Sequence, residues 1–100
     1  MPNINFLEWD GLTRVCFNRK NKTLSAAFKS KSVLELISKN YQIHCSLNNI
    51  AMDAEFDIKV KVEEILNECE FGQNRARTMG TDDFLKLLER FNSHGIHFSS

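Results

Sequence analysis

The sequence of 100 residues contains one proline, four glycines and no long apolar run. Because the single proline is Pro2, no proline interrupts a helix from Asn5 onward. The glycines stand apart, at positions 11, 72, 80 and 95, so none can form the G-x-G turn of a nucleotide or adenosyl cofactor site. No stretch approaches the ~20 apolar residues of a membrane span, and the first ten residues do not resemble a signal peptide. We therefore expect no membrane association and no cofactor site in this chain.

Cysteine is also scarce. Cys16, Cys45 and Cys69 are odd in number and widely spaced, which argues against a disulfide framework and favours a reducing compartment, the cytosol or nucleus. His94 and His97 are three residues apart, but a zinc site needs a third or fourth protein ligand. We therefore expect no metal site and no catalytic residue.

What the sequence does contain is a set of apolar stripes at helical spacing, with almost no strand signal. They predict an all-α single domain of about five helices that share one core. The connections fall near residues 20–23, 46–56 and 73–80. The stripes are Trp9, Leu12 and Cys16; Leu24, Ala27 and Phe28; Val33, Leu36, Ile37 and Tyr41; Ile58, Val62, Ile65, Leu66 and Cys69; and Phe84, Leu87, Leu88 and Phe91.

Capping residues predict where the helices begin and end. Side-chain oxygens that suit an N-cap stand before four of the stripes, and in two cases a Glu three residues later completes a capping box. Gly11 lies inside the first helix, where it costs about 1 kcal/mol relative to Ala. The expected starts are Asn5 (with Glu8), Ser32 (with Glu35), Asp57 and Thr81, and the expected stops are Gly72 and Gly95.

The net charge of zero hides an asymmetry along the chain. Residues 1–50 hold seven Lys or Arg and three acids, a balance of +4, whereas residues 51–100 hold six bases and ten acids, a balance of −4. The first half is thus the more plausible face toward a polyanion.

The basic residues cluster further. Six lie within residues 14–31, and Arg19, Lys20 and Lys22 fall at a predicted helix-to-helix junction, where free backbone N–H groups also suit phosphate. Arg75 and Arg77 form a second group in the loop between Gly72 and Gly80. The alternative, that these are helix-end charges and internal ion pairs, is about equally well supported by the residues alone. The six are Arg14, Arg19, Lys20, Lys22, Lys29 and Lys31.

Residues 8–14 and 17–29 read EWDGLTR and FNRKNKTLSAAFK, and this run closely resembles the start of the C-terminal domain of eukaryotic dimethyladenosine transferases. Residues 75–79 (RARTM) with 82–84 (DDF) are similar to that family's second C-terminal signature, and residues 95–99 (GIHFS) resemble its end. The resemblance covers about residues 3–99. It implies that residues 1–100 are the C-terminal helical domain of a nuclear, nucleolar enzyme that uses S-adenosylmethionine to dimethylate two adjacent adenosines near the 3′ end of small-subunit rRNA.

The family's catalytic parts are missing from this sequence. Its glycine-rich cofactor loop and its Asn-Leu-Pro-Tyr motif belong to an N-terminal Rossmann-like domain, and neither occurs here. The resemblance therefore transfers no catalytic, cofactor-binding or metal-binding residue to this chain, and the isolated chain is expected to be inactive.

Two functions remain. In the first, the domain docks and orients small-subunit rRNA or a pre-ribosomal particle beside its own N-terminal catalytic domain, with Arg19, Lys20 and Lys22 on phosphate. Arg14, Lys29, Arg75 and Arg77 would support them. In the second, the helices brace the catalytic domain or bind a ribosome-assembly factor, through the face that carries Phe6 or Trp9.

Overall fold

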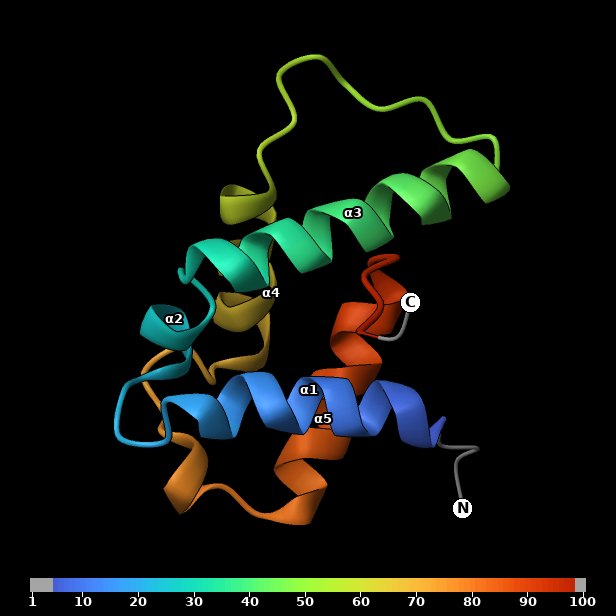
Figure 1. Ribbon diagram of the computed structural model, residues 1–100. Helices are drawn as coiled ribbons and strands as arrows, with labels where there is room; N and C mark the ends of the chain where they lie inside the picture. The colour runs from blue at the N-terminus through green and yellow to red at the C-terminus, as the bar shows by residue number, and fades with distance from the viewer. Residues whose placement is uncertain (1–4, 99–100) are drawn as a thin grey trace.

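The computed structural model describes residues 5–98, so Pro2 and Ser99 lie outside the described part of the chain. Within residues 5–98 the chain forms five α-helices, one 3₁₀ helix and no strand, which confirms the all-α prediction (Figure 1). No helix in this range is long and apolar enough to cross a bilayer. The helices are α1 (Phe6–Asn18), α2 (Leu24–Ala27), α3 (Lys31–Leu47), α4 (Ile58–Cys69), η1 (Ala76–Thr78) and α5 (Thr81–Ser93).

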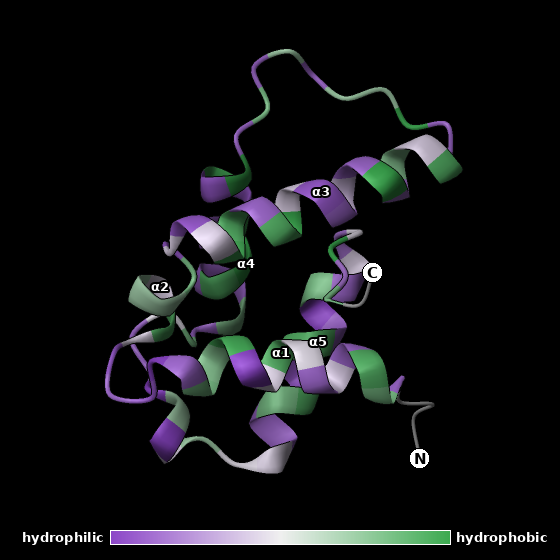
Figure 2. Ribbon diagram, in the orientation of Figure 1, coloured by the Kyte–Doolittle hydropathy of each residue, from purple (hydrophilic) through white to green (hydrophobic). Residues whose placement is uncertain are grey.

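One apolar core holds the helices together. α4 packs against α5, α1 crosses α5, and α3 lies over α4, while the short α2 fills the corner between α1 and α4 (Figure 1). The rings of Phe28 and Phe91 stack at the centre, with centroids 5.1 Å apart. Figure 2 shows that the loop between α1 and α2 is hydrophilic, in contrast to the apolar residues of the neighbouring helices. Completely buried side chains include Leu12, Leu24, Ile37, Ile65, Leu87 and Ile96.

Two of the predicted N-caps are confirmed. The Asn5 side chain accepts a hydrogen bond from the backbone N–H of Leu7 (2.9 Å), and the Asp57 side chain accepts one from Lys59 (2.9 Å). These bonds satisfy N–H groups that the first turn of a helix leaves without an intrahelical partner.

The other two predicted helix starts are wrong by one or two residues. α3 follows Ser30 rather than Ser32, and the two hydroxyls contact each other at 3.1 Å instead of capping the helix. α5 follows Gly80, whose N–H donates to the Asp83 carboxylate (3.0 Å), so Thr81 is already the first helical residue. In both cases a residue that suits an N-cap lies inside the first turn, where such residues are also tolerated.

The end of α4 and one member of the α3 stripe also differ from the prediction. α4 stops at Cys69 because Glu70 adopts a left-handed conformation (φ 64°), two residues before the predicted stop at Gly72. Gly95, by contrast, has φ 80° just past the end of α5, as predicted. Leu36 lies at the edge of its stripe and is 36% exposed.

The segment after α5 is fixed by a buried carboxylate. Glu8 was predicted to bond back to its own helix start, but it is 6% exposed and faces the C-terminal residues instead. Its side chain accepts a hydrogen bond from the backbone N–H of Phe98 (2.7 Å) and contacts His97 Nδ1 at 2.5 Å. Buried Asn40 of α3 donates to the carbonyl of His97 (2.9 Å). Residues 95–98 are therefore held between α1, α3 and α5.

Gly11 makes this arrangement possible. A Cβ atom at position 11 would lie 2.5 Å from the Phe98 carbonyl oxygen and 2.9 Å from its Cβ. Phe98 in turn is 4% exposed and packs edge-on against Phe91, with ring centroids 5.1 Å apart. Gly11, which was expected only to lower the stability of the helix, is thus the point where the C-terminal segment crosses α1.

We predict that Gly11→Ala destabilises the protein by about 1–3 kcal/mol, because the clash with Phe98 outweighs the gain in helix propensity. Urea unfolding followed by circular dichroism measures the change. Gly80→Ser is the matched control: an added Cβ there meets nothing within 4 Å, and Ser is a better N-cap, so we expect a small gain of a few tenths of a kcal/mol. A Gly11→Ala protein more stable than the wild type would contradict this reading of the crossing.

Candidate nucleic-acid interface

The junction between α1 and α2 forms a tight corner. α1 ends after Asn18, and the N–H of Lys22 donates to the carbonyl of Arg19 (2.9 Å), which turns the chain. The Thr23 side chain then caps α2 by accepting from the N–H of Ala26 (3.3 Å). Residues 19–22 form this turn outside the core, and all four are exposed.

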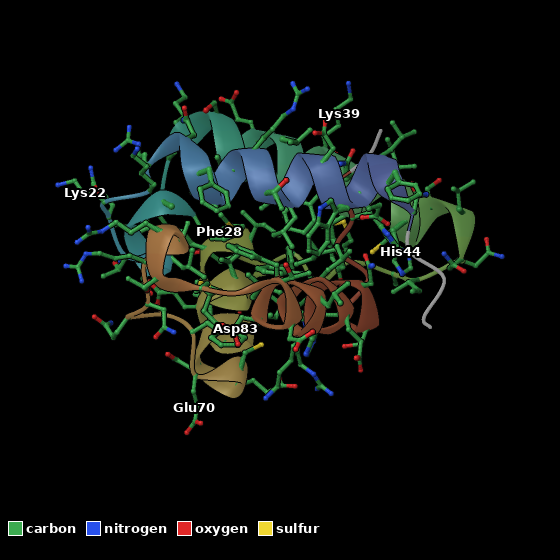
Figure 3. All side chains as sticks on the ribbon, turned by 90° about the horizontal axis from the view of Figure 1, so that it is seen from below. Lys22, Phe28, Lys39, His44, Glu70 and Asp83 are labelled. Carbon is green, nitrogen blue, oxygen red and sulfur yellow. The ribbon has the colours of Figure 1, made fainter. Side chains whose placement is uncertain are left out.

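Three cations of this turn face solvent. Within residues 5–98, Arg19, Lys20 and Lys22 make no ion pair with a carboxylate within 4.0 Å. Figure 3 shows the Lys22 side chain projecting away from the body of the molecule, among other side chains that end in nitrogen. Their charges are available to an external anion.

The loop before α5 lies directly against this junction, although it is fifty residues away in sequence. The N–H of Leu24 donates to the carbonyl of Asn74 (2.8 Å), and Ser25 donates to Gly72 (3.0 Å). Thr23 and Arg75 form an isolated antiparallel bridge. Arg75 Nε also donates to the carbonyl of Asn21 (3.0 Å), so its side chain crosses from one segment to the other.

We call the five cations of these two segments, Arg19, Lys20, Lys22, Arg75 and Arg77, the basic corner. Residues 19–23 and 73–79 contain no acid, and all five cations are exposed. Because like charges repel, their convergence costs free energy that backbone pairing and the buried Ala76 between the two arginines offset. The paired segments therefore carry a local excess of exposed positive charge, which attracts polyanions.

Arg14 and Lys29 form ion pairs with carboxylates and are therefore not counted in the basic corner. Arg14 pairs with Asp10 one turn earlier on α1 (2.9 Å), and Lys29 pairs with Glu63 of α4 (3.5 Å). Both pairs are well exposed, so each contributes at most about 1 kcal/mol and can open. Of the seven cations selected from the sequence, five lie on the two segments that the structure pairs.

The expectation of free backbone N–H groups at the start of α2 is wrong. The N–H groups of Leu24, Ser25 and Ala26 donate to Asn74, Gly72 and the Thr23 hydroxyl, respectively. The groups that the helix leaves without an intrahelical partner are thus satisfied within the protein. The first turn of α2 therefore offers an anion none of these three N–H groups.

The cysteines offer no nucleophile. All three are free and buried, and burial raises the pKa of the Cys16 thiol to about 12. Burial likewise raises the pKa of Cys69. A thiol in such surroundings stays protonated and unreactive near neutral pH.

The histidines and glycines are also engaged in the fold. His94 contacts Glu68 (3.1 Å) and His97 contacts Glu8, and within residues 5–98 no three potential ligands come together as a metal site. Gly11 and Gly72 are both tightly enclosed by other residues, and the four glycines lie in separate places. These residues do not fit an adenosyl cofactor, which needs a continuous glycine-rich loop against its ligand.

Sequence reasoning missed the polar contacts that position the described site. The Asn21 carbonyl that holds Arg75, and the Asn74 and Gly72 carbonyls that hold α2, carry no signal in the side chains. Trp9, which the sequence places on an apolar stripe and on a possible bracing face, is half-buried and packs edge-on against Phe84, with centroids 6.3 Å apart. Its contacts make it part of the core.

Comparison with known proteins gives a consistent set of relatives. No protein-family model matches the chain. It is 53% identical over 98 residues to a probable dimethyladenosine transferase of Drosophila melanogaster, and 41% identical over 98 residues to a dimethyladenosine transferase of Schizosaccharomyces pombe. Each match covers 98% of this chain but 32% of the relative, so the chain spans about a third of the length of these relatives.

A solved structure agrees with these sequences. The crystal structure of a dimethyladenosine transferase from Plasmodium falciparum superposes with a TM-score of 0.88 at 42% identity. The match covers 95% of this chain and 35% of the Plasmodium chain. The helical arrangement described above is therefore shared with a domain-sized part of that protein.

We predict that Arg75→Ala loosens the basic corner, because it removes the hydrogen bond from the guanidinium to the Asn21 carbonyl. Amide hydrogen exchange of Leu24 and Ser25 is expected to become about three- to tenfold faster, the effect of losing one exposed hydrogen bond. Arg77→Ala removes the same charge without that bond, so it serves as the control and is expected to leave both rates unchanged. Equal rates in the two variants would show that Arg75 does not hold the two segments together.

Proposed function

Because the chain is homologous to a domain-sized portion of dimethyladenosine transferases, we propose that it is the C-terminal domain of an rRNA adenine N6,N6-dimethyltransferase and that it docks and orients rRNA. The whole enzyme would use S-adenosylmethionine to dimethylate two adjacent adenosines near the 3′ end of small-subunit rRNA, in the nucleolus. Its partners would be small-subunit rRNA or a pre-ribosomal particle and its own catalytic domain.

One observation supports RNA docking above the others. The basic corner consists of two distant segments that pair through their backbones and that carry five exposed cations and no acid. RNA carries one phosphate per nucleotide, and cations held at a fixed spacing bind its backbone more strongly than scattered ones. Arg75 and Arg77 also offer planar guanidinium groups, which suit phosphate oxygens.

The proposed role is positioning rather than chemistry. Phosphate contacts fix the register and orientation of a nucleic acid without reading its bases, which suits recognition of folded RNA by its shape. Within residues 5–98 the cysteines are buried, no three potential ligands form a metal site, and the glycines form no cofactor loop. We therefore propose that methyl transfer takes place in the part of the enzyme that this chain does not match, and that the chain alone is inactive.

A second function, bracing another domain or binding an assembly factor, rests on a different observation. Phe6 and Leu7, in the first turn of α1, are 79% and 70% exposed. Large apolar side chains that lie together on a surface often mark a contact with another protein surface. This face carries neither the basic corner nor its neighbours, so both functions can hold for one domain.

The test of RNA docking is charge reversal at the junction. We predict that Arg19→Glu, Lys20→Glu and Lys22→Glu together weaken binding to a transcript of the small-subunit rRNA 3′ end by at least about tenfold at low salt. The slope of log K against log salt should fall by about 2, because some three phosphate contacts are lost. Filter binding of the 100-residue chain over a salt series measures both quantities.

The matched control reverses three exposed lysines elsewhere, Lys31→Glu, Lys39→Glu and Lys59→Glu, with the same change in net charge. We expect a clearly smaller effect and a nearly unchanged slope. If both triple variants lose RNA equally, the attraction is a matter of net charge and the assignment to the basic corner is wrong. If the wild-type chain does not bind RNA at low salt, the bracing function is favoured.

A further inference from the structure

A groove separate from the basic corner runs between the first half of α3 and the start of α4. Its volume is about 580 Å³, within the range of roughly 300–1,000 Å³ that is typical of ligand sites. Leu34 and Ile58 form its floor, and both are half-buried and pack against the core beneath. The remaining lining residues are Lys29, Lys31, Glu35, Ser38, Lys39, Gln42 and Lys59.

The rim of the groove is strongly basic. Four lysines face one carboxylate, Glu35, in the lining. Lys29 is engaged with Glu63 (3.5 Å), but within residues 5–98 Lys31, Lys39 and Lys59 make no ion pair within 4.0 Å. Figure 3 shows Lys39 on α3 and Lys22 at the α1–α2 turn on clearly separate parts of the surface. The groove is thus a second basic site with its own geometry.

The groove differs from the basic corner in composition. It contains no arginine and no aromatic side chain, so it offers neither a planar fork for phosphate nor a stacking surface for bases. A sugar-phosphate backbone is polar, so it would bury little apolar surface against the aliphatic floor. An aliphatic side chain of a peptide, by contrast, would lose water-exposed surface on this floor, while carboxylates beside it would meet the lysines.

We propose that this groove is a docking site for an acidic segment of a partner protein in which aliphatic residues alternate with Asp or Glu. The aliphatic side chains lie on Leu34 and Ile58, and the carboxylates pair with Lys31, Lys39 and Lys59. Lysine ammonium groups suit single carboxylates because they are flexible point charges. The proposal does not depend on RNA docking, since the two sites use different residues.

The test is a fluorescence anisotropy titration of the 100-residue chain with a labelled synthetic peptide in which Asp and Glu alternate with Leu. The wild type should bind it saturably at low salt. Lys31→Glu, Lys39→Glu and Lys59→Glu together should weaken binding by at least about tenfold. The triple variant at Arg19, Lys20 and Lys22 has the same net charge and should stay within about threefold of the wild type, because long-range attraction alone changes.

A second peptide tests the floor without altering the protein. Replacing each Leu of the peptide by Ser keeps its charge and should weaken binding by at least about tenfold, because the apolar contact is lost. Equal binding of the two peptides would overturn the proposal, as would absence of binding to the wild type at low salt. Displacement of the peptide by single-stranded RNA, together with loss of RNA affinity in the groove variant, would make the groove a nucleic-acid site instead.

Discussion

Backbone pairing between the start of α2 and residues 72–75 decides where the cations of this domain lie. Two hydrogen bonds and one antiparallel bridge join residues 23–25 to residues 72–75, about fifty residues away, and we call this pairing the seam. The Arg75 side chain adds a hydrogen bond across the seam. The same contacts satisfy the N–H groups at the start of α2, which would otherwise face water or an anion. A single seam therefore stabilises the shortest helix and assembles the basic corner.

The seam depends on the core behind it. Leu24 and Phe28 of the α2 region are buried, and Phe28 stacks on Phe91 of α5 and meets Phe98 edge-on, with centroids 6.2 Å apart. Phe98 is held in this position because its N–H donates to the Glu8 carboxylate and because Gly11 has no Cβ that would clash with its carbonyl oxygen. A four-residue helix has little stability of its own, so these tertiary contacts supply it. The basic corner is thus connected, through α2, to the buried contacts of the C-terminal segment.

How much of this was visible in the sequence depends on the range of the interaction. Helical spacing correctly gave the buried faces of α4 and α5, because each such face is a local property of one helix. The caps at Asn5 and Asp57 were also found locally. Glu8 and Gly11 were misread, since their partner Phe98 is about ninety residues away and nothing in the local pattern points to it.

In the candidate site, too, the local features could be predicted and the long-range contacts could not. Arg19, Lys20 and Lys22 stood out because they are close in sequence, and Arg75 and Arg77 because they share a loop. The sequence could not predict that the two groups meet. The seam is made by backbone carbonyl and amide groups, which give no side-chain signal. The lysine groove could not be predicted for a similar reason: its rim comes from the α2–α3 connection, α3 and α4, and no single stretch of sequence contains it.

The central claim, that the basic corner is the surface that meets RNA, is tested most directly by mapping the contact residue by residue. Amide chemical shifts of the isotope-labelled chain would be followed while a fragment of the small-subunit rRNA 3′ end is added. If the basic corner binds RNA, the shifts that change gather at residues 19–23 and 73–78, on both sides of the seam, while those of residues 34–42 and of the first turn of α1 stay unchanged. Changes confined to the first turn of α1 or to the groove, with the seam silent, would contradict it.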